Sequence, residues 1–186
     1  MRKSVVALLV ATLVVAGGLF AASRLVSATV NVAAPPPPCA DATAMTVADR
    51  AVPKGPVAGF CAPELAMAAT ILAAARDQGV GQYGETIGVM TAIGESGLRN
   101  LDYGDAAGPD SRGLFQQRDN GAWGTLADRM DPYTAATNFF RKLVRLPGWQ
   151  SMTPTQAAHA VQVNADPDYY TQYWGEAQAV VAALGG

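Results

Sequence analysis

The chain has 186 residues, of which 50% are hydrophobic and 15% are charged, and its formal net charge is −2. This length gives room for one domain with a modest core plus a short appendage. Residues 1–34 hold three basic residues and no acidic one, so the remainder carries ten Lys and Arg against fifteen Asp and Glu. Without a basic face to neutralise phosphates, the composition argues against nucleic acid as a partner.

The first 34 residues have the pattern of an export signal. Arg2 and Lys3 precede an apolar run at residues 5–22, which is the order of a signal peptide. Small residues suited to signal peptidase would allow cleavage after residue 28 or after residue 34. The run also has about the ~18-residue length of a minimal membrane span, so its retention as an anchor is the alternative. We therefore expect residues 1–34 to be a signal peptide or membrane anchor, and the protein to be secreted or anchored to the outer face of the cytoplasmic membrane.

A Pro- and Ala-rich linker and lead-in is expected at residues 35–60, beginning with a stiff polyproline-type spacer. Cys39 and Cys61 are the two cysteines of the chain. An even count in an oxidising compartment indicates one disulfide between them, and two free thiols are the alternative. With a single His and both cysteines bridged, we expect no metal site. Nor does the sequence indicate a cofactor, and it carries no signal for an oligomeric state.

From residue 61 onward the pattern is helical, which predicts a mainly α single domain at residues 61–186. The expected helices are residues 63–79, 83–96, 132–146, 154–163 and 167–184. Three of them begin with a capping residue followed by Pro, and these capping residues are Asp131, Thr153 and Asp166. No β-alternation is evident, although a short hairpin around residues 100–115 is left open.

The expected helix at residues 83–96 ends with one carboxylate, Glu95. Gly84, Gly88, Thr91 and Glu95 share one helical face at spacings of four, three and four. Each glycine costs about 1 kcal/mol relative to Ala inside a helix, so this stripe indicates close approach by another group. Either a neighbouring helix packs there and Glu95 is solvated, or the stripe floors a cleft into which Glu95 projects. In the second case apolar walls would raise the pKa of the Glu95 carboxyl, as a general acid requires.

Four segments, in this order, carry a family resemblance: "ESGL" (95–98), "SRGLFQQ" (111–117), "MDPYTAATNFFRKLV" (130–144) and "QAAHAVQVNADPDYY" (156–170). Together they resemble the lysozyme-like lytic transglycosylases of the goose-type lysozyme superfamily, above all its compact exported actinobacterial members. The resemblance spans residues 63–184. It implies a lysozyme-like fold, and peptidoglycan glycan strands as the partner.

The resemblance implies cleavage of the β-1,4 bond between N-acetylmuramic acid and N-acetylglucosamine, with Glu95 as general acid and base. Glu95 would protonate the glycosidic oxygen and then take the proton of the muramic acid 6-hydroxyl, forming a 1,6-anhydro sugar. Hydrolases add a second carboxylate, for which Asp105 and Asp119 are the candidates. A goose-type-like hydrolytic lysozyme is thus one alternative, and a non-catalytic peptidoglycan-binding module is another.

Several residues are expected to bind substrate or to shape the cleft. Gly113 would permit a tight backbone approach in front of Glu95, and Trp123 is the best Trp candidate for stacking on a sugar. The family's Tyr-Asn-Ala-Gly element reads "QVNAD" at 162–166, so the tyrosine that binds the catalytic Glu is not evident, and Gln162 or Tyr169 could replace it. The full set of substrate-binding candidates is Ser96, Gly113, Leu114, Gln116, Trp123, Gln162 and Tyr169.

Overall fold

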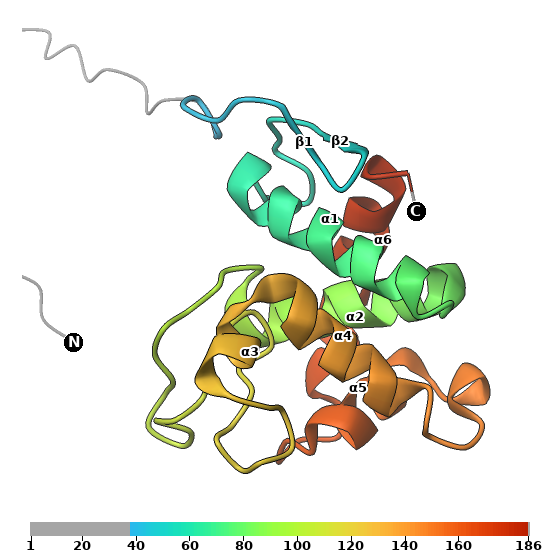
Figure 1. Cartoon of the computed structure of the whole chain (residues 1–186). Coiled ribbons are helices and arrows are strands. Elements are labelled where there is room, and N and C mark those ends of the chain that lie inside the picture. Colours follow the sequence, from blue (N-terminus) through green and yellow to red (C-terminus); the bar gives the residue numbers. More distant parts are fainter. Residues whose placement is uncertain (1–37, 186) are drawn as a thin grey trace, which may run out of the picture. The chain divides into compact units, whose positions relative to one another are not determined.

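The computed structural model describes residues 38–185, which fall within one compact unit (Figure 1). The expected signal peptide or anchor at residues 1–34 lies outside the described residues. Within residues 38–185, no helix has both the length and the apolar character needed to cross a membrane. The prediction of a mainly α domain is confirmed.

The described chain contains six α-helices, a two-stranded hairpin and two short 3₁₀ helices. Their bounds are β1 Met45–Val47, β2 Arg50–Val52, α1 Ala62–Asp77, α2 Gly81–Ser96, α3 Leu126–Met130, α4 Pro132–Leu143, η1 Trp149–Ser151, α5 Pro154–Gln162, η2 Tyr169–Tyr173 and α6 Trp174–Ala183. Helix α2 is central, because it contacts α1, α4, α5 and α6. Its side chains are buried on nearly every face, as expected of a helix enclosed by others.

The glycine stripe of α2 is explained by close packing. A side-chain carbon at Gly88 would collide with the ring of Phe140 on α4, and one at Gly84 would come within 3.2 Å of Trp149. Both positions therefore let a bulky aromatic ring approach the α2 backbone. The packing interpretation holds for the glycines, while Glu95, one turn beyond Thr91, lines a cleft.

The start of the last helix was predicted incorrectly. Asp131 and Thr153 cap α4 and α5 as expected, each accepting a hydrogen bond from a backbone N–H three residues on. Asp166 instead accepts from the N–H of Asp168 at 2.9 Å. This turn leads into η2, so the α-helix begins only at Trp174.

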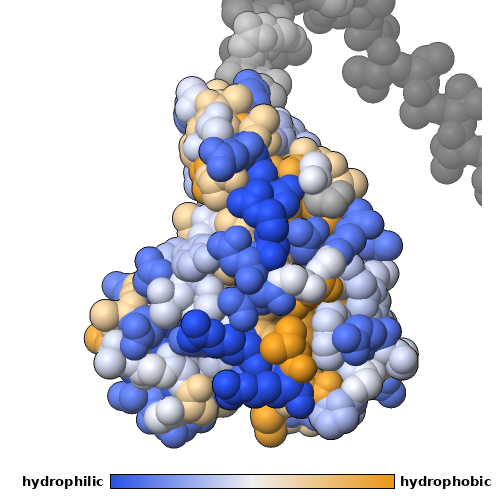
Figure 2. Space-filling view, turned by 45° about the vertical axis from the view of Figure 1, so that its right-hand side comes forward, coloured by the Kyte–Doolittle hydropathy of each residue, from blue (hydrophilic) through white to orange (hydrophobic). Residues whose placement is uncertain are grey.

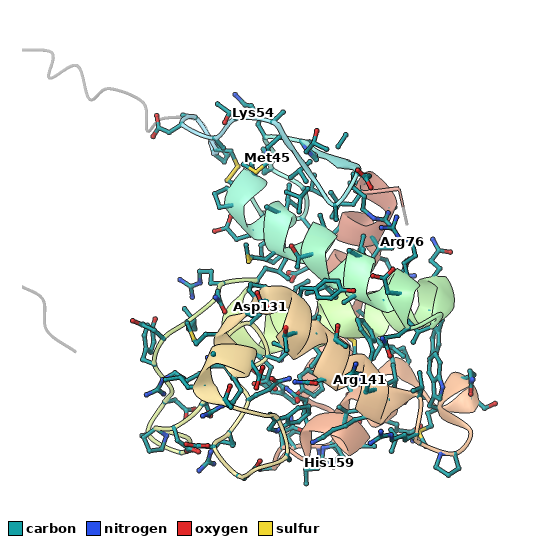
Figure 3. All side chains as sticks on the ribbon, in the orientation of Figure 1. Met45, Lys54, Arg76, Asp131, Arg141 and His159 are labelled. Carbon is teal, nitrogen blue, oxygen red and sulfur yellow. A yellow bond between two sulfur atoms is a disulfide. The ribbon has the colours of Figure 1, made fainter. Side chains whose placement is uncertain are left out.

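The lead-in before α1 is folded onto the helices. The hairpin of β1 and β2 pairs Met45 with Val52 and packs against α1. The predicted disulfide between Cys39 and Cys61 is confirmed, with the two Cα atoms 5.4 Å apart (Figure 3). Around residues 100–115 the antiparallel pairing is limited to isolated bridges, such as Leu101 with Gly113.

Candidate functional site

Glu95 lies in the last turn of α2, which ends at Gly97 in the left-handed conformation (φ 62°, ψ 39°). The backbone N–H of Gly97 donates to the carbonyl of Ile93 at 2.9 Å, and glycine suits this conformation because it lacks a Cβ. The C-terminal end of a helix is unfavourable for a negative charge. The fold thus holds a carboxyl where its charged form is disfavoured.

A cleft of about 760 Å³ opens beside Glu95, within the roughly 300–1,000 Å³ of small-molecule sites. It is lined by the end of α2, by parts of residues 101–123, by residues 162–166 and by Tyr169. We call residues 97–125, between α2 and α3, the cleft loop. Of the predicted site residues, Glu95, Asp105, Gln116, Trp123, Gln162 and Tyr169 line this cleft.

The pKa of Glu95 is raised above its usual value, chiefly because burial disfavours the charged carboxylate. The negative charge of Asp105 raises it further, whereas hydrogen bonds from the side chains of Tyr170 and Gln162 lower it. The Tyr170 hydroxyl donates to Oε1 of Glu95. A partly buried acid with two hydrogen-bond donors can hold a proton and also tolerate losing it.

Tyr170 was missed by sequence reasoning, which placed it within the expected helix at residues 167–184 and gave it no role at the site. Its ring is fully buried, and burial together with the nearby Glu95 raises the pKa of its hydroxyl, so the hydroxyl remains a proton donor to Glu95. The neighbouring Tyr169 hydroxyl donates to the carbonyl of Gly94 at 2.8 Å instead. Gln162, which was considered for the role, lowers the pKa of Glu95, while its side-chain amide donates to the carbonyl of Phe115 at 2.8 Å. The sequence does place two adjacent tyrosines, Tyr169 and Tyr170, shortly after "QVNAD", and this pair was the available sign of a tyrosine partner for Glu95.

Two polar side chains fasten the cleft loop to the helices. Ser96 Oγ donates to the carbonyl of Leu114 at 2.8 Å, and Gln162 Nε2 donates to the carbonyl of Phe115 at 2.8 Å. Leu114 itself is fully buried in the core and does not line the cleft, so its expected contact with substrate is not supported. Ser96 is buried as well, and it positions the loop.

Gly113 also differs from its expected role. Its φ is +78°, and a side-chain carbon there would collide with the carbonyl oxygen of Arg129 in α3. The close approach that requires glycine is therefore to α3 and not to a ligand in front of Glu95. Gln116, in contrast, lines the cleft, and its side-chain amide donates to the carbonyl of Gly113 at 3.2 Å.

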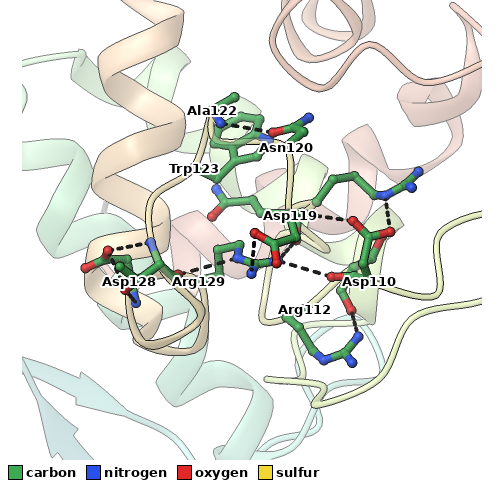
Figure 4. A network of polar contacts seen from close by, with 12 residues as sticks. Asp110, Arg112, Asp119, Asn120, Ala122, Trp123, Asp128 and Arg129 are labelled. Carbon is green, nitrogen blue, oxygen red and sulfur yellow. Dashed lines mark hydrogen bonds and ion pairs between the residues drawn. The ribbon is translucent and has the colours of Figure 1, made fainter.

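A buried arginine organises the same loop from the other side (Figure 4). Arg129 is 3% exposed, and its guanidinium donates to the carbonyls of Asp110 at 3.1 Å and Gln117 at 3.4 Å. It also pairs with Asp119 at 3.1 Å. Asp119 does not line the cleft, so the structure does not place it as a second carboxylate opposite Glu95.

Asp105 remains at the cleft, where one of its carboxylate oxygens accepts hydrogen bonds from the N–H groups of Ala107 (2.9 Å) and Gly108 (2.7 Å). Trp123 lines the cleft but is only 5% exposed and packs in the core, and the Lys142 ammonium lies 3.2 Å from its ring centroid. Little of the Trp123 ring is thus free to stack on a ligand.

Within residues 38–185, no group of three or more His, Cys, Asp or Glu side chains is placed to hold a metal ion. The chain matches no model of a known protein family and no curated protein.

Proposed function

We propose that this protein is an exported peptidoglycan-cleaving glycosidase, acting on the β-1,4 bond between N-acetylmuramic acid and N-acetylglucosamine with Glu95 as general acid and base. One arrangement carries the proposal: Glu95 lies at a cleft, burial raises its pKa, and the Tyr170 hydroxyl donates a hydrogen bond to its carboxyl. The proposed substrate is inferred from the four ordered sequence segments that resemble lytic transglycosylases.

The chemistry starts with Glu95 protonated. Glu95 gives its proton to the glycosidic oxygen while an oxocarbenium-like state develops at the anomeric carbon of the muramic acid. Tyr170 and Gln162 stabilise the carboxylate that remains. The 6-hydroxyl of the same muramic acid then attacks the anomeric carbon and gives its proton to Glu95, which restores the acid and leaves a 1,6-anhydro end.

Hydrolysis is the second candidate, and Asp105 is the observation that favours it. Asp105 lines the cleft and is close enough for its charge to raise the pKa of Glu95, so it could direct a water molecule, the role that inverting hydrolases give to a second carboxylate. We prefer transglycosylation because one oxygen of Asp105 is already engaged by two backbone N–H groups, and because Asp119 is paired with Arg129.

The test is mass spectrometry of the soluble products that residues 35–186 release from purified peptidoglycan. We expect muropeptides with 1,6-anhydro ends, and a rate reduced by about 10²-fold or more in Glu95→Gln, as for loss of a general acid. Glu176→Gln, an exposed change on α6 away from the cleft, is the matched control and should leave the rate unchanged.

Each other outcome decides between the candidates. Reducing ends that disappear in Asp105→Asn would establish hydrolysis. Wild-type protein that pellets with peptidoglycan but releases nothing would make it a binding module and overturn the enzymatic proposal.

A further inference from the structure

Two strongly exposed apolar side chains line the cleft beside Glu95. Among the described residues, six large hydrophobic side chains are exposed, and two of these, Tyr103 (59% exposed) and Val163 (78%), line the cleft. Val163 is the most exposed of the six. The two come from different segments, Tyr103 from the cleft loop and Val163 from the connection after α5. Side chains this exposed make little contact with the core, and their place at a cleft leaves their apolar surface available to a ligand.

Val163 is also held in a conformation that its side chain disfavours. It ends α5 in the left-handed region, with φ 57° and ψ 48°. Helices that end this way usually have Gly or Asn there, and a β-branched residue with positive φ is an outlier. Because the Val163 side chain is largely exposed, core packing does not account for it. Backbone strain of this kind is found at ligand sites, where the side chain is needed for another reason.

The same two segments also place polar side chains at the cleft, beside small and apolar ones. Asp105 lies two residues after Tyr103 in the chain, and Asn164 and Asp166 follow Val163; all line the cleft. A ligand that fits this pattern presents polar groups along its edges and apolar surface on its faces. Sugar rings meet that description, since their C–H groups lie on the faces and their hydroxyl and acetamido groups lie around the rim.

We propose that Tyr103 and Val163 are specificity-determining residues that hold the apolar faces of sugar units in a bound glycan strand, one from each segment of the cleft. This inference rests on the proposed function, since it names how the same cleft recognises its substrate. Tyr103 covers one ring face, and the two methyl groups of Val163 contact a second sugar unit.

The test measures binding without turnover. Glu95→Gln in residues 35–186 is the parent, and the probe is a peptide-free tetrasaccharide of alternating N-acetylglucosamine and N-acetylmuramic acid, titrated by calorimetry. Adding Tyr103→Ala should raise Kd about tenfold, the effect of uncovering about half a tyrosine ring. Adding Val163→Gly should raise Kd roughly 15-fold, the effect of burying two methyl groups. The matched control is Leu126→Ala, which removes a side chain that is 55% exposed on α3 outside the cleft and should leave Kd unchanged.

A thermal measurement on the same variants separates ligand contact from a structural role. Val163→Gly should not lower Tm, because glycine adopts positive φ without strain, while it weakens binding. Lower Tm with unchanged Kd would overturn the inference. An unchanged Kd in both variants would also overturn it, as would a change in Kd that occurs only when the glycan carries peptides. In each of these cases the parent still binds glycan, so the proposed function stands. Failure of the parent to bind any glycan would overturn both proposals.

Discussion

Two regions of the molecule adjoin Glu95, and they differ in how much polar contacts contribute to their packing. The helices α1, α2, α4 and α6 pack through fully buried apolar side chains such as Ile71, Met90 and Phe140. The cleft loop also buries Leu114 and Phe115 in the core, but it adds polar anchors from Ser96, Gln162 and Arg129. On the face in Figure 2, small hydrophobic patches are set among hydrophilic residues. The helices therefore determine the position of Glu95, while the cleft loop forms part of the cleft beside it. We expect substitutions to disrupt the helices and the loop separately.

The largest effect is expected on the helical side, from Phe140→Ala. Phe140 is fully buried against Gly88, where no side chain exists to fill the cavity, so the free energy of unfolding should fall by about 3–5 kcal/mol. Chemical denaturation measures this loss. The exposed Arg141→Ala on the same helix should change it by less than about 0.5 kcal/mol. A loss below about 1 kcal/mol for Phe140→Ala would contradict the assigned core.

A smaller loss of stability but a larger loss of function is expected in the loop, from Arg129→Met. The carbonyls of Asp110 and Gln117 would lose their buried donor, which costs about 1–3 kcal/mol. Hydrogen exchange should accelerate in residues 101–123 and stay unchanged in α1 and α2, while glycan cleavage drops. The exposed Arg145→Met serves as the control and should show neither effect. Uniform acceleration across the helices would mean that the two regions unfold as one.

The smallest structural effect is expected where the regions meet, from Tyr170→Phe. The Tyr170 hydrogen bond lowers the pKa of Glu95, so its removal raises that pKa. Because Glu95 must be protonated to act as an acid, the alkaline limb of the activity profile should move to higher pH. Tyr133→Phe, on the surface of α4, should leave the profile in place, and an alkaline limb that moves to lower pH in Tyr170→Phe would contradict the assignment.

The raised pKa of Glu95 should also make the stability of the fold depend on pH. Burial raises the folded-state pKa of Glu95 above its ordinary value of 4.5, so the stabilisation from the protonated form is complete below about pH 4.5 and is lost as the pH rises through the folded-state pKa. Tyr170→Phe should therefore destabilise the protein more at neutral pH than at pH 4, which thermal denaturation at the two pH values would check.

The sequence predicted elements whose signals are local. Helices α4 and α5 begin where Asp131 and Thr153 precede a proline, because the cap and the proline act on the adjacent turn alone. The same signal at Asp166 was wrong, since the side chain served a turn instead. The hairpin of β1 and β2 has strands of three residues, which are too short to show an alternating pattern. The lysozyme-like fold itself stays a prediction.

The candidate site was only half predictable. The stripe of Gly84, Gly88 and Glu95 identified the helix face, but periodicity could not show that the glycines meet aromatic rings while the carboxyl meets a cleft. Tyr170 reaches Glu95 across 75 residues of chain, and Arg129 reaches Asp110 across 19. Such partners depend on how the chain folds back on itself, and no local pattern encodes them.

The disulfide determines how a mechanical load would enter the domain. Cys39 is bonded to Cys61, which directly precedes α1. A pull on the chain before Cys39 would pass across the sulfur atoms to the start of α1 and bypass residues 40–60 between the cysteines. Arg50 in that segment, bound to the carbonyls of Leu184 and Gly185, would then be spared the tension. Such a load would thus reach the domain through a helix before it reached the hairpin of β1 and β2.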